Sequence, residues 1–180
     1  IKVEFPDSAD GTVKVDFSEF DKQAAKYLGP DYRFSTFRLS LQGMGGGTFH
    51  ERRAGRIGRF EQDSPEYMRL FTNYARQVEA HLREKGWLNK AFIYWFDEPA
   101  PRDYEFVRQG MERIHRAAPG LRRMLTEEPV KELAGVVDIW CPVTPNITSS
   151  TVARERAAGR ELWWYICTGP KGPYFTIFID

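Results

Sequence analysis

The chain has 180 residues, and its 26 lysines and arginines nearly balance its 25 aspartates and glutamates, so the formal net charge is +1. This length fits one ordinary domain, and the balanced charge excludes a nucleic-acid binder that relies on a broad basic face. Apolar runs stay below the ~18–20 residues of a membrane span, and no signal-peptide pattern opens the chain. Two cysteines are too few for a disulfide scaffold or a structural zinc site, so the composition indicates a soluble globular protein.

The first half of the chain alternates between predicted helix and strand. Apolar residues at helical spacing predict a helix over 16–28, and the alternating segment 37–41 predicts a strand. A glycine loop over 43–47 and a polar, arginine-rich stretch follow. A second helix is expected over 63–86, because it opens with a capping residue, a proline in the first turn and an acid near the positive end of the helix dipole.

The second half continues the same pattern. The segment 91–96 (AFIYWF) is a continuous apolar run, which is typical of a strand buried on both faces. A helix is predicted over 101–120. Further strands are expected at 123–125, 136–140 and 162–166, with a short helix at 152–158 before the last of them.

This alternation predicts a parallel α/β sheet with right-handed crossovers. About five strands are visible, whereas a closed (β/α)8 barrel takes ~250 residues. The last apolar run, 174–180, stops in mid-pattern with no helix to cover the preceding strand. We therefore expect residues 1–180 to form part of a (β/α)8 TIM-type barrel, without its first and last strands. A small open doubly wound sheet is the alternative.

Two acids, Asp97 and Glu98, directly follow the apolar run 91–96. In parallel α/β folds, active sites lie at the carboxyl ends of the strands. An apolar wall beside a carboxyl group disfavours its ionisation, so one acid of such a pair can hold a proton while the other stays charged, as acid/base catalysis requires. Adjacent strand residues point to opposite faces, and Pro99 and Pro101 supply the turn that lets both acids serve one site.

The acidic segment has two alternative interpretations. Acidic surface turns before a proline are common. The same pattern also ends the magnesium-binding strand of many ATPases, but those proteins need a phosphate loop of the form G-x-x-x-x-G-K-[ST]. The glycine cluster 43–47 is followed by Thr48-Phe49-His50 without that lysine, so nucleotide hydrolysis is disfavoured.

The run 81–99 (HLREKGWLNKAFIYWFDEP) resembles the catalytic-domain signature of glycoside hydrolase family 123. So do 137–142 (VDIWCP) and 161–170 (ELWWYICTGP), with matching order and spacing. The three segments span about half of the chain. The resemblance extends to a larger set of predicted glycosidases that share this domain.

The resemblance implies a specific chemistry. Family members of known activity are exo-acting β-N-acetylgalactosaminidases with a (β/α)8 barrel and an Asp-Glu pair after the fourth strand. By this likeness Asp97 orients the 2-acetamido group of the substrate and stabilises positive charge on the ring. Glu98 protonates the leaving oxygen and then deprotonates the incoming water. The nucleophile is the acetamido oxygen of the substrate, an exception to the two-carboxylate scheme.

Aromatic residues are expected to form the sugar site, since apolar sugar faces stack on rings. Trp140 ends one predicted strand, and Trp163 and Tyr165 lie two apart in another, so they share a face. The resemblance implies that Tyr165 hydrogen-bonds the acetamido oxygen. Core packing is the competing interpretation for each ring, and Trp164, on the opposite face, is assigned to packing under a helix.

The cysteines, the histidines and the arginine-rich segment give weaker indications of function. A disulfide between Cys141 and Cys167 cannot be deduced, and buried free thiols are the default. The three histidines are scattered along the chain, so a histidine metal site is not expected. The arginine-rich segment 52–59 is interpreted as a solvated loop, with contact to an acidic or sulfated sugar as the alternative.

The leading hypothesis is a glycosidase that releases a terminal 2-acetamido sugar, β-GalNAc first, with retention, and that needs no cofactor. Its partner is a carbohydrate, either a glycan or a glycoconjugate, and the family resemblance implies an extracellular or periplasmic location. A non-catalytic carbohydrate-binding or structural barrel domain is one alternative, and a glycosidase for a different glycan is another. Acid/base work by Glu98 predicts a bell-shaped pH–rate profile, which simple binding does not.

Overall fold

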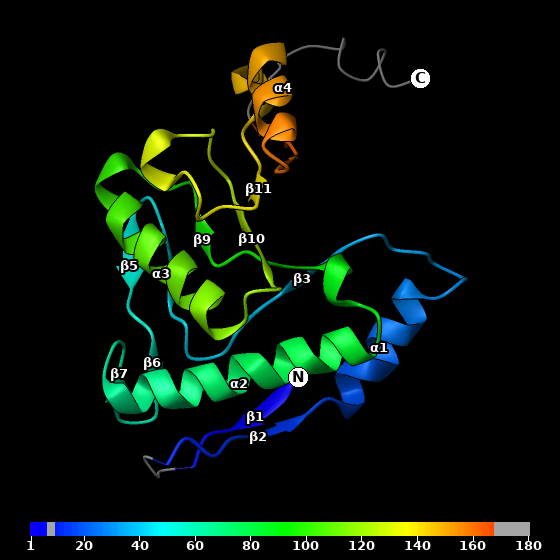
Figure 1. The fold of residues 1–180 in the computed structure, drawn as a ribbon, viewed down its shortest axis with the longest axis vertical. Coiled ribbons are helices and arrows are strands. Elements are labelled where there is room, and N and C mark those ends of the chain that lie inside the picture. The colour runs from blue at the N-terminus through cyan, green and yellow to red at the C-terminus, as the bar shows by residue number, and fades with distance from the viewer. Residues whose placement is uncertain (7–9, 168–180) are drawn as a thin grey trace.

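A computed structural model describes residues 1–6 and 10–167, which form a mixed α/β fold (Figure 1). The described helices lie where the apolar periodicity predicts them: α1 (Ser18–Leu28), α2 (Pro65–Glu84), α3 (Tyr104–Ala117) and α4 (Ser149–Ala157). Short 3-10 turns cover Leu88–Lys90, Pro101–Asp103, Lys131–Leu133 and Thr144–Asn146. None of the described helices is long and apolar enough to cross a membrane. The apolar run 174–180 lies outside the described residues.

A five-stranded parallel sheet forms the centre of the fold. Its strands in spatial order are β12 (Glu161–Leu162), β11 (Ile139–Trp140), β10 (Arg122–Leu125), β8 (Ala91–Ile93) and β3 (Phe37–Leu39). Parallel neighbours need crossover connections, which α2 supplies between β3 and β8, α3 between β8 and β10, and α4 between β11 and β12. The predicted parallel α/β sheet is confirmed, and within the described residues it does not close into a barrel.

Short antiparallel pairs surround this sheet. They are β1 (Lys2–Glu4) with β2 (Lys14–Asp16), β4 (Gly46–Thr48) with β5 (Glu51–Arg53), and β6 (Arg56–Ile57) with β7 (Phe60–Glu61). The segment 52–59, predicted as a loop, is thus partly built into two hairpins. Strands of two or three residues are too short for an alternating pattern to indicate them.

The register of the sheet separates two faces. Phe92 pairs with both Arg38 and Arg122, so these side chains share one face. Ile93 pairs with Leu39 and Arg123, which lie on the other. We call the first the open face and the second the helix face.

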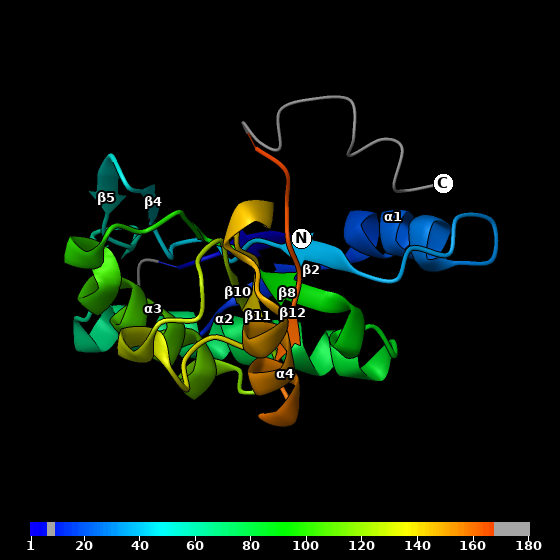
Figure 2. The same ribbon diagram turned by 90° about the horizontal axis from the view of Figure 1, so that it is seen from above.

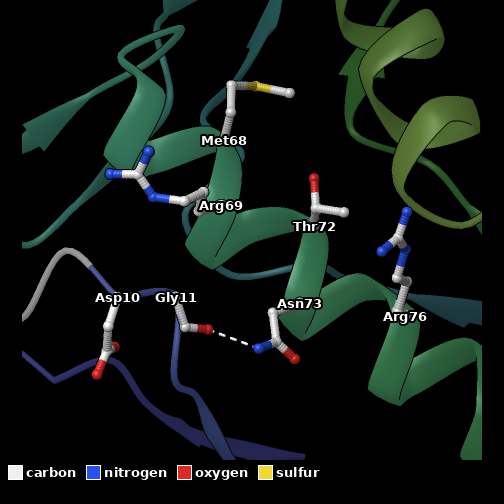
Figure 3. A pocket seen from close by; sticks show the side chains of 7 residues that line it. All are labelled: Asp10, Gly11, Met68, Arg69, Thr72, Asn73 and Arg76. Carbon is white, nitrogen blue, oxygen red and sulfur yellow. Dashed lines mark hydrogen bonds between the residues drawn. The ribbon is translucent and has the colours of Figure 1, made fainter.

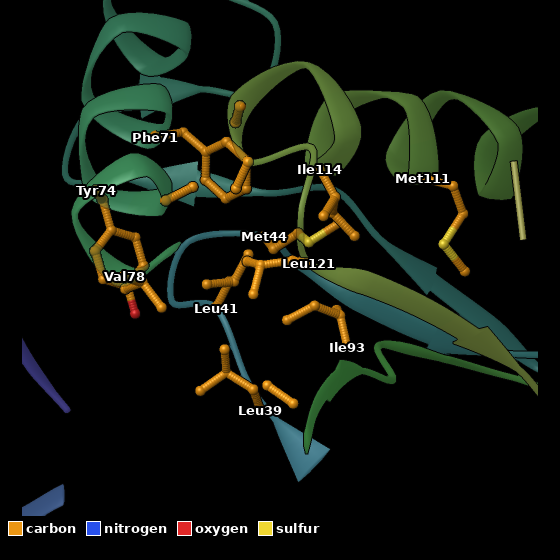
Figure 4. Close-up of a cluster of buried hydrophobic side chains, with 14 of the residues drawn as sticks. Leu39, Leu41, Met44, Phe71, Tyr74, Val78, Ile93, Met111, Ile114 and Leu121 are labelled. Carbon is orange, nitrogen blue, oxygen red and sulfur yellow. The ribbon is translucent and has the colours of Figure 1, made fainter. Parts of the chain in front are cut away.

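The main hydrophobic core lies between the helix face and the helices. Figure 2 shows α2, α3 and α4 on one side of the sheet. Buried side chains of α2 and α3 meet those of the sheet and its loops in Figure 4: Phe71, Tyr74, Val78, Met111, Ile114, Leu39, Leu41 and Ile93. Full burial of one such side chain stabilises the fold by about 1.5–3 kcal/mol. The core therefore holds the sheet, and with it the sheet's carboxyl-terminal edge, in a fixed position.

The start of α2 shows how local sequence sets this packing. The Ser64 side chain accepts a hydrogen bond from the Tyr67 N–H at 3.2 Å, and Pro65 is the first residue of the helix. Both features were predicted from the sequence. They start α2 in the orientation that buries Tyr67 and the apolar stripe that follows it along the helix fully in the core.

The apolar run 91–96 is not one strand. β8 ends at Ile93, and the chain then forms β9 (Phe96–Asp97), which pairs in parallel with β4 instead of β3. Gly47 makes this pairing feasible, since a Cβ there would lie 2.5 Å from Cε2 of Phe96. The strand therefore turns outward just where the two acids begin.

Two tryptophans differ from their predicted places. Trp140 is 1% exposed and belongs to the main core, on the helix face. It pairs with Leu125, which has the same orientation, so Ile139 and Cys141 take the open face instead. Trp164, predicted to pack under a helix, is 58% exposed.

Candidate functional site

Asp97 and Glu98 lie at the carboxyl-terminal edge of the sheet. Asp97 is the last residue of β9, and Glu98 has a φ of 44°, in the left-handed region that non-glycine residues rarely adopt. Such backbone strain is often found at functional sites. It also breaks the alternation of the strand, so two consecutive carboxyl side chains can serve one site.

Two hydroxyl groups hold Asp97. The Tyr94 hydroxyl and the Thr126 hydroxyl both donate to Asp97 Oδ1, the latter at 3.1 Å. The two hydroxyl oxygens are themselves 3.3 Å apart. Tyr94 comes from the turn after β8 and Thr126 from the end of β10, so two neighbouring strands fix this carboxylate.

Glu98 is fixed at both its backbone and its side chain. Its N–H donates to Thr126 Oγ1 at 2.9 Å, which holds the left-handed backbone in place. The Tyr165 hydroxyl donates to Glu98 Oε1. Thr126, directly after β10, therefore contacts both members of the pair and links their positions.

The two tyrosines remain proton donors at physiological pH. Burial, together with the hydrogen bond to Asp97, raises the pKa of Tyr94 well above its usual range. Burial and the hydrogen bond to Glu98 do the same for the pKa of Tyr165. Because a phenol that donates to a carboxylate loses its proton less readily, each acid has a permanent hydrogen-bond donor.

Each acid lines its own cavity. A cavity of about 370 Å³, the Asp97 cavity, presents these charged and hydroxyl-bearing side chains: Arg38, Ser40, Thr48, Arg53, Tyr94 and Asp97. A cavity of about 220 Å³, the Glu98 cavity, is lined by Glu98, Pro99, Thr126, Glu127, Glu128, Pro142, Val143 and Tyr165. A substrate that reaches from one to the other would contact both carboxyl groups.

Glu127 and Glu128 form a second carboxyl pair that the sequence analysis missed. Burial, followed by a hydrogen bond with Glu128, raises the pKa of Glu127 to about 8. The same hydrogen bond, aided by one from the Asn146 amide, lowers the pKa of Glu128. The pair therefore shares one proton near neutral pH. The sequence does contain a signal for this second pair. Glu127-Glu128-Pro129 comes shortly after β10, and the similar segment Asp97-Glu98-Pro99 comes at the end of β9.

The structure brings together three of the five predicted site residues. Asp97, Glu98 and Tyr165 meet at the sheet edge. Trp163 packs on the open face, where its ring and that of Phe92 are nearly perpendicular and their centroids lie 5.0 Å apart. Trp140 lies apart in the main core. The hydroxyl groups of Tyr94 and Thr126 were missed, because their role depends on contacts between strands.

A disulfide, a metal centre and a further cavity are the other kinds of site that the described residues could form. Both cysteines are free thiols, Cys141 buried and Cys167 exposed. No group of three or more histidine, cysteine or acidic side chains within 1–6 and 10–167 has the geometry of a metal site. A cavity of about 520 Å³ lies between the loop at Gly11 and α2 (Figure 3). The Asn73 amide donates to the Gly11 carbonyl there (Figure 3), with 2.6 Å between the two atoms. This cavity shares no lining residue with the Asp97 cavity or the Glu98 cavity.

Active sites of parallel α/β folds lie at the carboxyl ends of the strands, and a carboxyl pair there can supply acid/base chemistry. The sequence matches the profile described as "Glycoside hydrolase 123, catalytic domain" over residues 3–179, so the chain belongs to glycoside hydrolase family 123. The resemblance stated from the sequence motifs is thereby confirmed.

Comparison with solved structures finds a similar fold. The fold is similar to that of a family 123 glycoside hydrolase from Clostridium perfringens, which was studied for glycolipid glycan hydrolysis. The TM-score is 0.57 at 17% identity, over 92% of this chain and 32% of that one. The chain therefore spans about a third of the length of that protein. A comparison with curated protein sequences finds no match.

Proposed function

We propose that this chain carries the active site of a glycoside hydrolase that removes a terminal 2-acetamido sugar, β-linked GalNAc, from a glycan or glycoconjugate. The observation that supports this most is the Asp97–Glu98 pair. The left-handed backbone at Glu98 and the partner Thr126, which contacts both residues, support a shared role for the two acids.

Adjacent carboxyl groups suit substrate-assisted catalysis. A carboxylate that attacks the sugar directly must lie ~5 Å from the acid, across the scissile bond. An acid that only orients the acetamido group can sit beside its partner. In this mechanism the acetamido oxygen forms a bond to the anomeric carbon while the bond to the leaving oxygen breaks. Water then opens the resulting oxazoline ring, and the configuration is retained.

The two acids have different tasks in this mechanism. Asp97 accepts the N–H of the acetamido group and stabilises the positive charge that develops as its oxygen attacks. Glu98 gives its proton to the leaving oxygen and takes one back from the attacking water. The Tyr94 and Thr126 hydroxyls hold Asp97 in orientation, and the Tyr165 hydroxyl does so for Glu98.

This division of labour gives the substrate a direction. The terminal sugar occupies the Asp97 cavity, because Asp97 must reach its acetamido group. The leaving group extends into the Glu98 cavity, because Glu98 must reach the glycosidic oxygen. Trp163 and Tyr165 on the open face are the proposed aromatic contacts, whereas Trp140 is left out because it is buried on the helix face.

The sheet fits a larger architecture under this proposal. Five parallel strands with helices on one face correspond to part of a (β/α)8 barrel whose open face is the barrel interior. Residues 1–180 then supply part of the catalytic domain.

The test is hydrolysis of 4-nitrophenyl β-GalNAc and β-GlcNAc by the full-length protein, with Asp97→Asn and Glu98→Gln beside it. Turnover of GalNAc by the wild type, and its loss in both folded variants, is the expected result. If a folded wild type cleaves neither sugar, the proposal is wrong and the non-catalytic carbohydrate-binding alternative gains support. Preferential cleavage of GlcNAc would keep the chemistry and correct the sugar.

A further inference from the structure

Positively charged residues outnumber negatively charged ones in the lining of the Asp97 cavity. Two arginines, Arg38 and Arg53, line it together with one acidic residue, Asp97. A neutral sugar presents only hydroxyl and amide groups, which a single charged side chain and several hydroxyls can bind. The second guanidinium therefore calls for an explanation.

Arg38 projects from β3 onto the open face. Its guanidinium lies over the Tyr94 ring, 5.0 Å from the centroid. Among residues 1–6 and 10–167, no carboxylate forms an ion pair with it. Stacking on the ring orients the planar guanidinium and leaves its N–H groups available, and such a fork matches the oxygens of a sulfate or carboxylate.

Arg53 reaches the cavity from the β4–β5 hairpin. Gly45, with a φ of 76°, allows this, because a Cβ there would lie 2.2 Å from the Arg53 carbonyl oxygen. Gly46 pairs directly with Arg53 across the hairpin. The glycine cluster thus folds the arginine-rich segment back on itself and places one of its arginines at the cavity wall.

Arg53 can exchange its present partner at small cost. Its Nε lies 3.1 Å from a Glu51 carboxylate oxygen, and the two side chains are 74% and 61% exposed. Exposed ion pairs of this kind contribute only about 0–1 kcal/mol. A doubly hydrogen-bonded anionic ester is a stronger partner for arginine than a solvated glutamate.

We propose that the Asp97 cavity accepts a terminal 2-acetamido sugar that bears a sulfate ester, and that Arg53 and Arg38 bind the sulfate. This inference rests on the proposed function, since it assigns the terminal sugar to the Asp97 cavity. It names the class of substrate that the two arginines select.

The experiment compares kcat/KM for the 4-nitrophenyl glycosides of β-GalNAc, its 4-sulfate and its 6-sulfate, using the full-length protein. The variants are Arg53→Ala, Arg53→Lys and Arg38→Gln. Arg56→Ala is the matched control, because Arg56 is exposed, pairs with Glu61 and does not line the cavity.

We expect one sulfated substrate to exceed the neutral one by about tenfold, in line with one charge-assisted contact at a partly exposed site. Arg53→Ala and Arg38→Gln reduce this ratio towards one, Arg53→Lys retains part of it, and Arg56→Ala leaves it unchanged. Equal or better cleavage of the neutral sugar by the wild type overturns the inference but leaves the proposed function intact. Failure to cleave any of the three substrates overturns both.

Discussion

The Asp97 cavity and the Glu98 cavity share an edge of the sheet but differ in charge. Arginines from β3 and the β4–β5 hairpin line the first, and the Glu127–Glu128 pair lines the second. No lysine or arginine is among the residues lining the Glu98 cavity. Under the proposed function, this difference predicts that the two ends of the substrate are recognised by different means, with anionic groups favoured at the terminal sugar and disfavoured at the leaving group.

The largest expected effect follows loss of the acids themselves. Glu98→Ala should lower kcat/KM by about 10²–10⁴-fold, as loss of a general acid–base residue typically does, and Asp97→Ala should have an effect of similar size (~10²–10³-fold), because it removes a charged group that stabilises the transition state. The two roles separate on addition of azide, a small nucleophile that needs no general base. Azide should restore turnover of an aryl glycoside by Glu98→Ala, with a β-glycosyl azide as product, and should not rescue Asp97→Ala. Equal rescue of both variants would contradict the division of labour.

Thr126 is a positioning residue at the junction of the two cavities. Thr126→Val removes the acceptor for the Glu98 N–H and a donor to Asp97, which leaves a polar group unpaired. We expect a cost of about 1–2 kcal/mol, which is about 5–30-fold in kcat. Thr126→Ser keeps the hydroxyl and should retain most of the activity. A purely structural role would make Val and Ser alike in kcat while lowering the Tm of both.

Tyr94 contacts Asp97 and Tyr165 contacts Glu98, so substituting each tyrosine tests the role of one acid. Tyr94→Phe and Tyr165→Phe should each lower kcat about fivefold, since each removes one hydrogen bond of about 1 kcal/mol from an acid. The Tyr165→Phe effect should grow as the leaving group becomes poorer, because Glu98 protonates that group. The Tyr94→Phe effect should not depend on the leaving group. A series of aryl glycosides with different phenols measures this, and the reverse pattern would exchange the roles of the acids.

The carboxyl pair beside the leaving group should appear in the pH dependence of stability. The pKa of Glu127 is raised from 4.5 to about 8, so between these values the folded protein holds a proton that the unfolded chain has released. The free energy of unfolding therefore falls as pH rises through this window. Glu127→Gln removes that dependence.

Thermal unfolding at pH 5 and pH 8 measures this effect. After allowance for the partial exposure of Glu127, we expect the wild type to lose about 1 kcal/mol relative to Glu127→Gln, or about 2–4 °C in Tm. Glu132→Gln is the matched control, because Glu132 is an exposed carboxyl in the same loop region. Parallel Tm curves for wild type and Glu127→Gln would contradict the shared proton.

The sequence predicted the parts of this site that depend on local order. Asp97 and Glu98 stand directly after an apolar run, and Trp163 and Tyr165 are two residues apart, so their common face follows from strand geometry. The helices were equally predictable, because their caps and apolar stripes lie within single segments. Family membership came from three short motifs of the same local kind.

The features of the site that the sequence did not predict depend on how separate segments pair with one another. Trp140 was placed at the site because it ends a strand, but the face it occupies is set by the register of β11 against β10. The left-handed backbone of Glu98 is stabilised by Thr126 from a different strand. The position of Arg53 depends on a three-residue hairpin strand, which leaves no periodic pattern.

The central claim, that the acetamido group held by Asp97 is the nucleophile, can be tested by changing that group alone. The measurement is kcat/KM of the wild type for 4-nitrophenyl β-GalNAc substrates whose acetyl group carries zero, one, two or three fluorine atoms. Each fluorine withdraws electrons from the attacking oxygen, so the account predicts a steep and progressive fall in kcat/KM. Rates that do not depend on fluorine would mean that the acetamido oxygen does not attack, and the assignment of Asp97 as the residue that orients it would be contradicted.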